Sequence, residues 1–157
     1  MAHNAVKPFK VLTNGQTIED IGTSFDINAY NDEPKITTTL VEGSVRVSNS
    51  YGSALLKPGQ QGQASTNSAI TIVTDDDMEK TLAWKNGLFI FNRTDLYTLM
   101  RQLSRWYDVD VIYQDGVKDD VFFGKIKQDN NLSQILKVLE LGDVHFRIEG
   151  KKLIVLP

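Results

Sequence analysis

Few side chains in this sequence have the type and spacing that catalysis or metal binding requires. The chain has no cysteine and two histidines, His3 and His145. Disulfides, thiolate catalysis and zinc–thiolate sites are therefore excluded. His145 alternates with the apolar Val144 and Phe146, which is typical of a solvent-facing strand residue. No Ser–His–Asp or paired-His spacing is present, so we expect no enzyme activity, no metal site and no cofactor.

The run Asp75-Asp76-Asp77 is the densest group of carboxylates. Consecutive residues of an extended chain point to opposite faces, so three in a row make a poor cation cage. A helix cap in a solvated linker is the favoured interpretation.

Bulk composition limits the partners and the compartment. Apolar residues make up 41% of the 157 residues and the net charge is −3. With no basic stripe, nucleic acid is not expected as a partner. The longest apolar run is far below the roughly 18 residues of a membrane span. If the protein works outside the cytoplasm, we expect its anchor upstream of Met1.

Residues 1–74 alternate apolar and polar side chains in short segments separated by turns. The turn-forming pairs are Asn14-Gly15, Glu42-Gly43, Tyr51-Gly52 and Pro58-Gly59. Regular short strands without a crossover helix predict a mostly β part, either a sandwich or a solenoid-like fold.

From residue 75 the pattern changes. Residues 75–87 predict a linker with a short helix ending at Asn86-Gly87. After a strand at 88–91, apolar spacing predicts a helix near 95–107 with Asn92 or Thr94 as its cap. A second helix is expected near 132–141, with Asn130 or Asn131 as cap and Gly142 as stop. Residues 88–157 thus predict a small α+β domain of two βαβ units and a final strand that forms a terminal hairpin.

Two aromatic residues end the first long helix. Trp106 follows Leu99 and Leu103 at helical spacing, which favours a core position, and Tyr107 is the better candidate for a partner contact. Leu153 and Val155 in the last strand are further candidates, because an open sheet edge can accept a partner's strand.

Several motifs resemble the FecR family of membrane-anchored anti-sigma regulators. The N-terminal part resembles a portion of the family's β-rich domain, and residues 88–157 resemble the secretin/TonB short N-terminal (STN) signalling domain. The matching strings are Lys7–Val11, Gly22-Thr23-Ser24-Phe25, Leu40–Val45, Leu56–Gln61, Phe89–Asn92, Leu103–Val109 and Leu132–Leu136.

The resemblance implies a periplasmic signal relay. The chain would bind the signalling domain of a TonB-dependent outer-membrane receptor and control an extracytoplasmic-function (ECF) sigma factor through an upstream segment. It also implies a candidate self-cleavage bond at Gly22–Thr23, by attack of the Thr23 hydroxyl on the Gly22 carbonyl. The alternative at these residues is a tight turn needed for folding only.

Two other functions are compatible with parts of the sequence. A module binding a small molecule or glycan is the alternative, although residues 1–74 contain no Trp and only Tyr30 and Tyr51 as tyrosines. A secretin-like ring piece would suit residues 88–157 alone.

The resemblance also implies β-strands upstream of Phe9. Without them, strands at Phe9–Leu12 and Phe25–Ala29 would present an uncovered sheet edge. We therefore expect self-association through the β-rich part, most simply about a two-fold axis.

Overall fold

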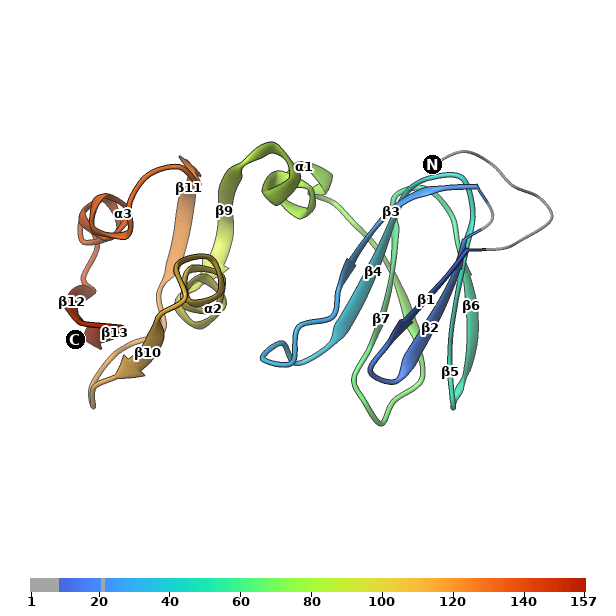
Figure 1. Ribbon diagram of the computed structural model, residues 1–157, viewed down its shortest axis with the longest axis horizontal. Coiled ribbons are helices and arrows are strands. Elements are labelled where there is room, and N and C mark those ends of the chain that lie inside the picture. The colour runs from blue at the N-terminus through green and yellow to red at the C-terminus, as the bar shows by residue number, and fades with distance from the viewer. Residues whose placement is uncertain (1–8, 21) are drawn as a thin grey trace. The chain divides into compact units, whose positions relative to one another are not determined.

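A computed structural model describes residues 9–20 and 22–157. The chain divides into two compact units, one reaching Thr81 and the other beginning at Leu82. Figure 1 shows strands throughout the first unit and both long helices in the second. None of the described helices has the length and apolar character that a bilayer crossing requires.

In the N-terminal unit, every regular element up to Thr74 among the described residues is a strand, so the expectation of a mostly β part is confirmed. Two four-stranded antiparallel sheets have the orders β1-β2-β5-β6 and β3-β4-β7-β8. The strands are β1 (Phe9–Thr13), β2 (Gln16–Asp20), β3 (Ser24–Asn28), β4 (Ile36–Glu42), β5 (Val45–Asn49), β6 (Gly52–Leu56), β7 (Gln60–Ala64) and β8 (Thr71–Thr74).

Consecutive hairpins in this unit alternate between the two sheets. β1–β2 and β5–β6 belong to one sheet, and β3–β4 and β7–β8 belong to the other. Ile18, Val47 and Leu56 from the first sheet form one buried cluster with Leu40 from the second. Burial of these apolar side chains holds the sheets together.

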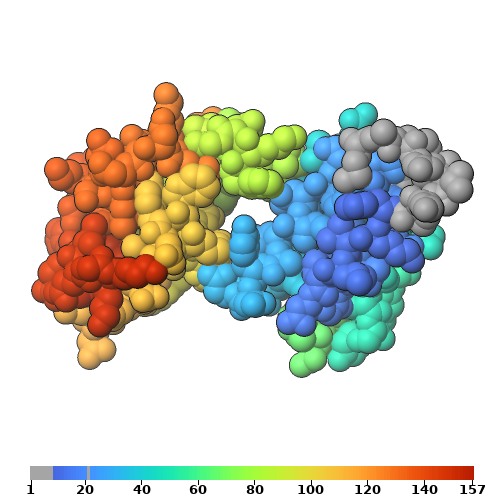
Figure 2. Space-filling model, viewed as in Figure 1, coloured from blue at the N-terminus to red at the C-terminus, as the bar shows by residue number. Residues whose placement is uncertain are grey.

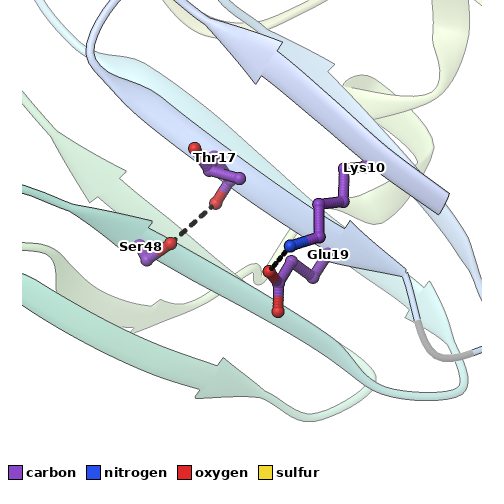
Figure 3. A network of polar contacts seen from close by, with 4 residues as sticks. All are labelled: Lys10, Thr17, Glu19 and Ser48. Atoms are coloured by element: carbon purple, nitrogen blue, oxygen red, sulfur yellow. Dashed lines mark hydrogen bonds and ion pairs between the residues drawn. The ribbon is translucent and has the colours of Figure 1, made fainter. Parts of the chain in front are cut away.

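The outer face of the first sheet carries polar contacts between neighbouring strands. Lys10 Nζ lies 2.6 Å from Glu19 Oε1 on the neighbouring strand, and Ser48 Oγ donates to the Thr17 carbonyl at 3.3 Å (Figure 3). The hydrogen bond and charge of Lys10 hold the pKa of Glu19 below its ordinary value.

The helix α1 (Met78–Thr81) ends the N-terminal unit, and the C-terminal unit begins with the short 3-10 helix η1 (Ala83–Asn86). Its helices, α2 at Leu96–Tyr107 and α3 at Leu132–Leu139, are the longest among the described residues and confirm the predicted pair. Its strands are β9 (Leu88–Asp95), β10 (Asp110–Tyr113), β11 (Val121–Lys127), β12 (His145–Glu149) and β13 (Lys152–Leu156).

Sheet pairing in this unit differs from two simple βαβ units. β9 pairs antiparallel with β11, whereas β10 pairs in parallel with β13 and β13 pairs antiparallel with β12. Each helix therefore links strands of different sheets, although the order strand–helix–strand is as expected. One core, including Leu99, Leu103, Ile135 and Leu153, unites both helices with the sheets.

The helix caps were predicted in part correctly. Asn131 caps α3 through a capping box with Gln134, as the sequence indicated. For α2 the prediction was wrong: the cap is Asp95, whose carboxylate accepts from Thr98 N at 2.8 Å. Thr94 is buried, and its hydroxyl accepts instead from Asn92 N. α3 ends at Leu139, and Gly142 N donates to the Leu139 carbonyl beyond it.

Candidate functional site

The Gly22–Thr23 peptide lies in the turn that carries the chain from β2 in one sheet to β3 in the other. Gly22 is exposed, with φ of 82°, a left-handed conformation that disfavours side chains. Thr23 is half-buried. Ile21, the preceding residue, lies outside the described residues.

Asp20, the last residue of β2, contacts this turn directly. Its side chain is only 7% exposed, and the Thr23 hydroxyl donates a hydrogen bond to Asp20 Oδ1. A carboxylate that accepts from the hydroxyl can also take its proton. Asp20 was not among the predicted site residues, although its position three residues before Thr23 at a strand end was a usable signal.

Gly43 packs against the same peptide from the β4–β5 turn. A Cβ built on Gly43 would lie 2.5 Å from the Gly22 carbonyl oxygen and 2.7 Å from Thr23 Cγ2. Only a residue without a side chain fits there. From the sequence, Gly43 is predicted only as a turn former, because nothing local links it to Gly22.

Chemically, the arrangement combines a hydroxyl next to its own peptide bond, a carboxylate acceptor and the carbonyl of the exposed residue Gly22. These groups suit attack of the hydroxyl on the preceding carbonyl. The same contacts also hold the crossing between the two sheets in place.

The structure places the predicted partner residues of the C-terminal unit inside it. Leu153 and Val155 are fully buried on β13, which has a strand on both sides. The open edges of this sheet are those of β10 and β12. Tyr107 is half-buried: its ring packs on the core and its hydroxyl donates to the Asn130 carbonyl.

Trp106 was expected in the core, and this prediction was wrong, because 52% of its surface is exposed. Its indole Nε1 donates to the Gln128 carbonyl at 3.0 Å, and its ring meets the Phe89 ring edge-on. Trp106 and Gln128 line a shallow open groove with Gly87 and Leu88. α2 extends past the end of the core, so Trp106 keeps the helical spacing of the apolar residues but faces solvent.

The remaining chemical candidates have structural roles. Asp77 Oδ1 accepts from Lys80 N, and Asp75 Oδ2 accepts from the Thr81 hydroxyl, so this run caps α1. Within residues 9–20 and 22–157 no group of three or more His, Asp or Glu side chains could hold a metal ion. His145 is exposed on β12, as predicted, and His3 lies outside the described residues.

Fold and site together define a mostly β protein of two small units, with open strand edges and a Gly–Thr turn between the two sheets of the first unit. Residues 88–155 match the family model described as FecR, C-terminal. The match confirms the resemblance to FecR-type regulators. The comparison with the STN domain stays a prediction.

Two crystal structures have a similar fold over almost the whole chain. Both are described as "a putative anti-sigma factor" from Parabacteroides distasonis ATCC 8503, at 1.65 Å and 2.50 Å resolution. They are 24% identical to this chain, with TM-scores of 0.83 and 0.82. The alignments cover 99% of this chain and 74% and 73% of those chains. No curated protein matches the chain.

Proposed function

We propose that this chain is the periplasmic, signal-relaying part of a membrane-anchored anti-sigma regulator, and that it acts by binding and not by enzymatic turnover. The observation that carries the proposal is the FecR match over residues 88–155. The similar fold of two chains described as anti-sigma factors supports it.

The proposed input is the signalling domain of a TonB-dependent outer-membrane receptor, and the output is control of an ECF sigma factor through a segment upstream of this chain. In the C-terminal unit, β12 offers an open edge to such a partner. Its residues are mostly exposed, and β13 occupies only one side of it. An added strand would gain main-chain hydrogen bonds along this edge.

Titration calorimetry against receptor signalling domains encoded beside the gene tests the relay. We expect binding by the intact chain and a marked loss of affinity in Ile148→Lys on β12. Ile112→Lys on β10 is the matched control, because the two isoleucines are equally exposed, at 40% and 41%. Equal effects of both variants would contradict docking at β12. No binding to any receptor domain, with heat observed for a glycan instead, would favour the glycan-module alternative.

The Gly22–Thr23 geometry supports a second proposed property, self-cleavage. The Thr23 Oγ would bond to the Gly22 carbonyl carbon while the Gly22–Thr23 C–N bond breaks, and Asp20 would pass the hydroxyl proton to the departing amine. Water would then hydrolyse the resulting ester, releasing a Gly22 carboxylate and restoring the Thr23 hydroxyl. Each product atom comes from the chain or from water.

Mass spectrometry of the purified chain over time tests this step. We expect fragments 1–22 and 23–157 in the wild type and in Thr23→Ser, slower cleavage in Asp20→Asn, and none in Thr23→Ala. An equally stable, intact chain in all four would show that the turn serves folding only.

A further inference from the structure

The groove beside Trp106 has a volume of about 420 Å³ and is lined only by residues of the C-terminal unit. Sites for small ligands range from roughly 300 to 1,000 Å³. The groove lies where the end of η1, the end of α2 and the segment after β11 meet. In Figure 2 the yellow-green atoms around η1 lie next to the orange atoms that follow β11. Its size therefore suits a small ligand or a short part of a longer one.

Gln128 is the lining residue that points to a ligand. It is 6% exposed, and its side-chain Oε1 is buried without a hydrogen-bond partner among the described residues. An unpaired buried acceptor costs stability, so native folds keep few of them. The terminal torsion of a glutamine is broad, so the amide can turn its oxygen towards a donor in the groove at little cost. A ligand that supplies an O–H or N–H would remove a cost that the free chain carries.

The main-chain groups of Gln128 are already bonded within the unit. Its N–H donates to the Gly87 carbonyl at 2.9 Å, and its carbonyl accepts from Trp106 Nε1 at 3.0 Å. A peptide that added to the sheet here would need these same groups. Recognition in the groove therefore depends on side chains and not on strand addition.

The side chains of the groove combine an aromatic ring with mixed polar groups. Half of the Trp106 surface is exposed, and the exposed Asn86 amide can both donate and accept hydrogen bonds. Lys127 can donate and Asp129 can accept, and both are exposed. Their charges cancel, and no other charged residue among those described lines the groove. The site therefore favours an uncharged ligand over an anion or a cation.

We propose that the groove binds a short stretch of a neutral glycan. The C–H face of a sugar ring is apolar and can lie on the Trp106 indole, whose face is electron-rich. One sugar hydroxyl can donate to Gln128 Oε1. Other hydroxyls can bond with Asn86, Lys127 and Asp129. A purely apolar ligand would leave Gln128 unpaired, and a charged ligand would lie beside a like charge.

Fluorescence of Trp106 reports on the groove directly. The chain has two tryptophans, and Trp84, on η1, does not line the groove, so Trp84→Phe leaves Trp106 as the only indole. We titrate this variant of the full 157-residue chain with neutral hexasaccharides of glucose, mannose or xylose. At least one of them should change the emission with saturation. Trp106→Phe, which keeps only the Trp84 indole, should show no saturable change.

Gln128→Met separates a role in binding from a role in folding. Titration calorimetry should show an affinity for the hexasaccharide that is lower by about tenfold, because the sugar hydroxyl loses its acceptor. The urea midpoint of the same variant should be unchanged or higher, since an unpaired buried acceptor is removed. Gln114→Met is the matched control, because Gln114 is exposed after β10 and does not line the groove. It should keep the wild-type affinity.

Four results would overturn the proposal. The first is no saturable change with any of the hexasaccharides at millimolar concentration, and the second is equal affinity in Gln128→Met and Gln114→Met. The third is a lower urea midpoint in Gln128→Met, which would show that the amide supports the fold. The fourth is tighter binding of an uncharged Ser/Thr peptide, which would assign the groove to a protein partner. The groove shares no residue with β12, so this proposal and the receptor relay can fail independently.

Discussion

Gly43 is the residue on which the geometry of the Gly22–Thr23 turn depends most directly. Its φ of 89° and the close Gly22 carbonyl both exclude a side chain. We expect Gly43→Ala to lower the free energy of unfolding by more than about 2 kcal/mol, combining backbone strain with a steric clash.

Gly15→Ala is the control for the strain alone. Gly15 has φ of 99°, and a Cβ there would meet nothing within 4 Å. Its cost should be about 1 kcal/mol. Urea unfolding of both variants measures the difference, and equal costs would show that the contact with Gly22 does not matter.

Arg93 is a non-glycine residue with φ of 50°, in the irregular part of the β9–β11 pairing between Phe91 and Thr94. The left-handed backbone costs about 1 kcal/mol for an ordinary side chain. Arg93→Gly removes that cost but adds flexibility to the unfolded chain, so we expect a net gain of about 0.5 kcal/mol.

Lys127→Gly is the control, because Lys127 lies on the partner strand and has no positive φ. It tests whether the stability gained in Arg93→Gly comes from the left-handed backbone at position 93. It should lose about 1 kcal/mol in the same urea titration. A loss in both variants would mean that the Arg93 side chain contributes more than its backbone costs.

At the scale of the element, α2 depends on its cap. Burial raises the pKa of Asp95, but the hydrogen bonds from Thr98 and the charge of Arg101 outweigh it, so the pKa lies below its ordinary 3.8. The ionised carboxylate therefore stabilises the fold above pH 3.8, and that contribution is lost as the pH falls through the lower, folded-state pKa.

Two substitutions separate the cap from its charge. Asp95→Ala should cost about 1 kcal/mol at pH 7, because Thr98 N loses its acceptor. Asp95→Asn should keep most of the cap yet show a weaker loss of stability on acidification below pH 3.8. Thermal unfolding between pH 2 and 7 would contradict this assignment if Asn and wild type followed the same curve.

At the scale of the molecule, the two units have separate hydrophobic cores that share no residue. We therefore expect a substitution in one core to destabilise only the unit that contains it. Leu99→Ala should destabilise the C-terminal unit by roughly 2–5 kcal/mol, and Val47→Ala should act on the N-terminal unit. Both side chains are fully buried.

Hydrogen exchange with mass spectrometry resolves the two units. Each variant should accelerate exchange only in the unit that contains it. Faster exchange across the whole chain in either variant would show that the units unfold as one.

The sequence by itself determined the local elements. Alternating side chains in residues 9–74 are sufficient for strands, and the spacing from Leu96 to Leu103 and from Leu132 to Leu139 is sufficient for helices, since each pattern is set by neighbouring residues. Turn pairs such as Asn14-Gly15 and the Asn131 helix cap could also be predicted from the sequence. The motifs also indicated the FecR family before any contact was known.

Only the tertiary structure decided which elements meet. Periodicity does not say which strand pairs with which, so the pairing of β9 with β11 and of β10 with β13 was not predictable. Helical spacing places Trp106 on the apolar face of α2 but not beyond the end of the core, where it is exposed. The contacts of Asp20 and Gly43 with the Gly22–Thr23 turn exist because strands from two sheets converge there, and such convergence depends on burial summed over the whole unit.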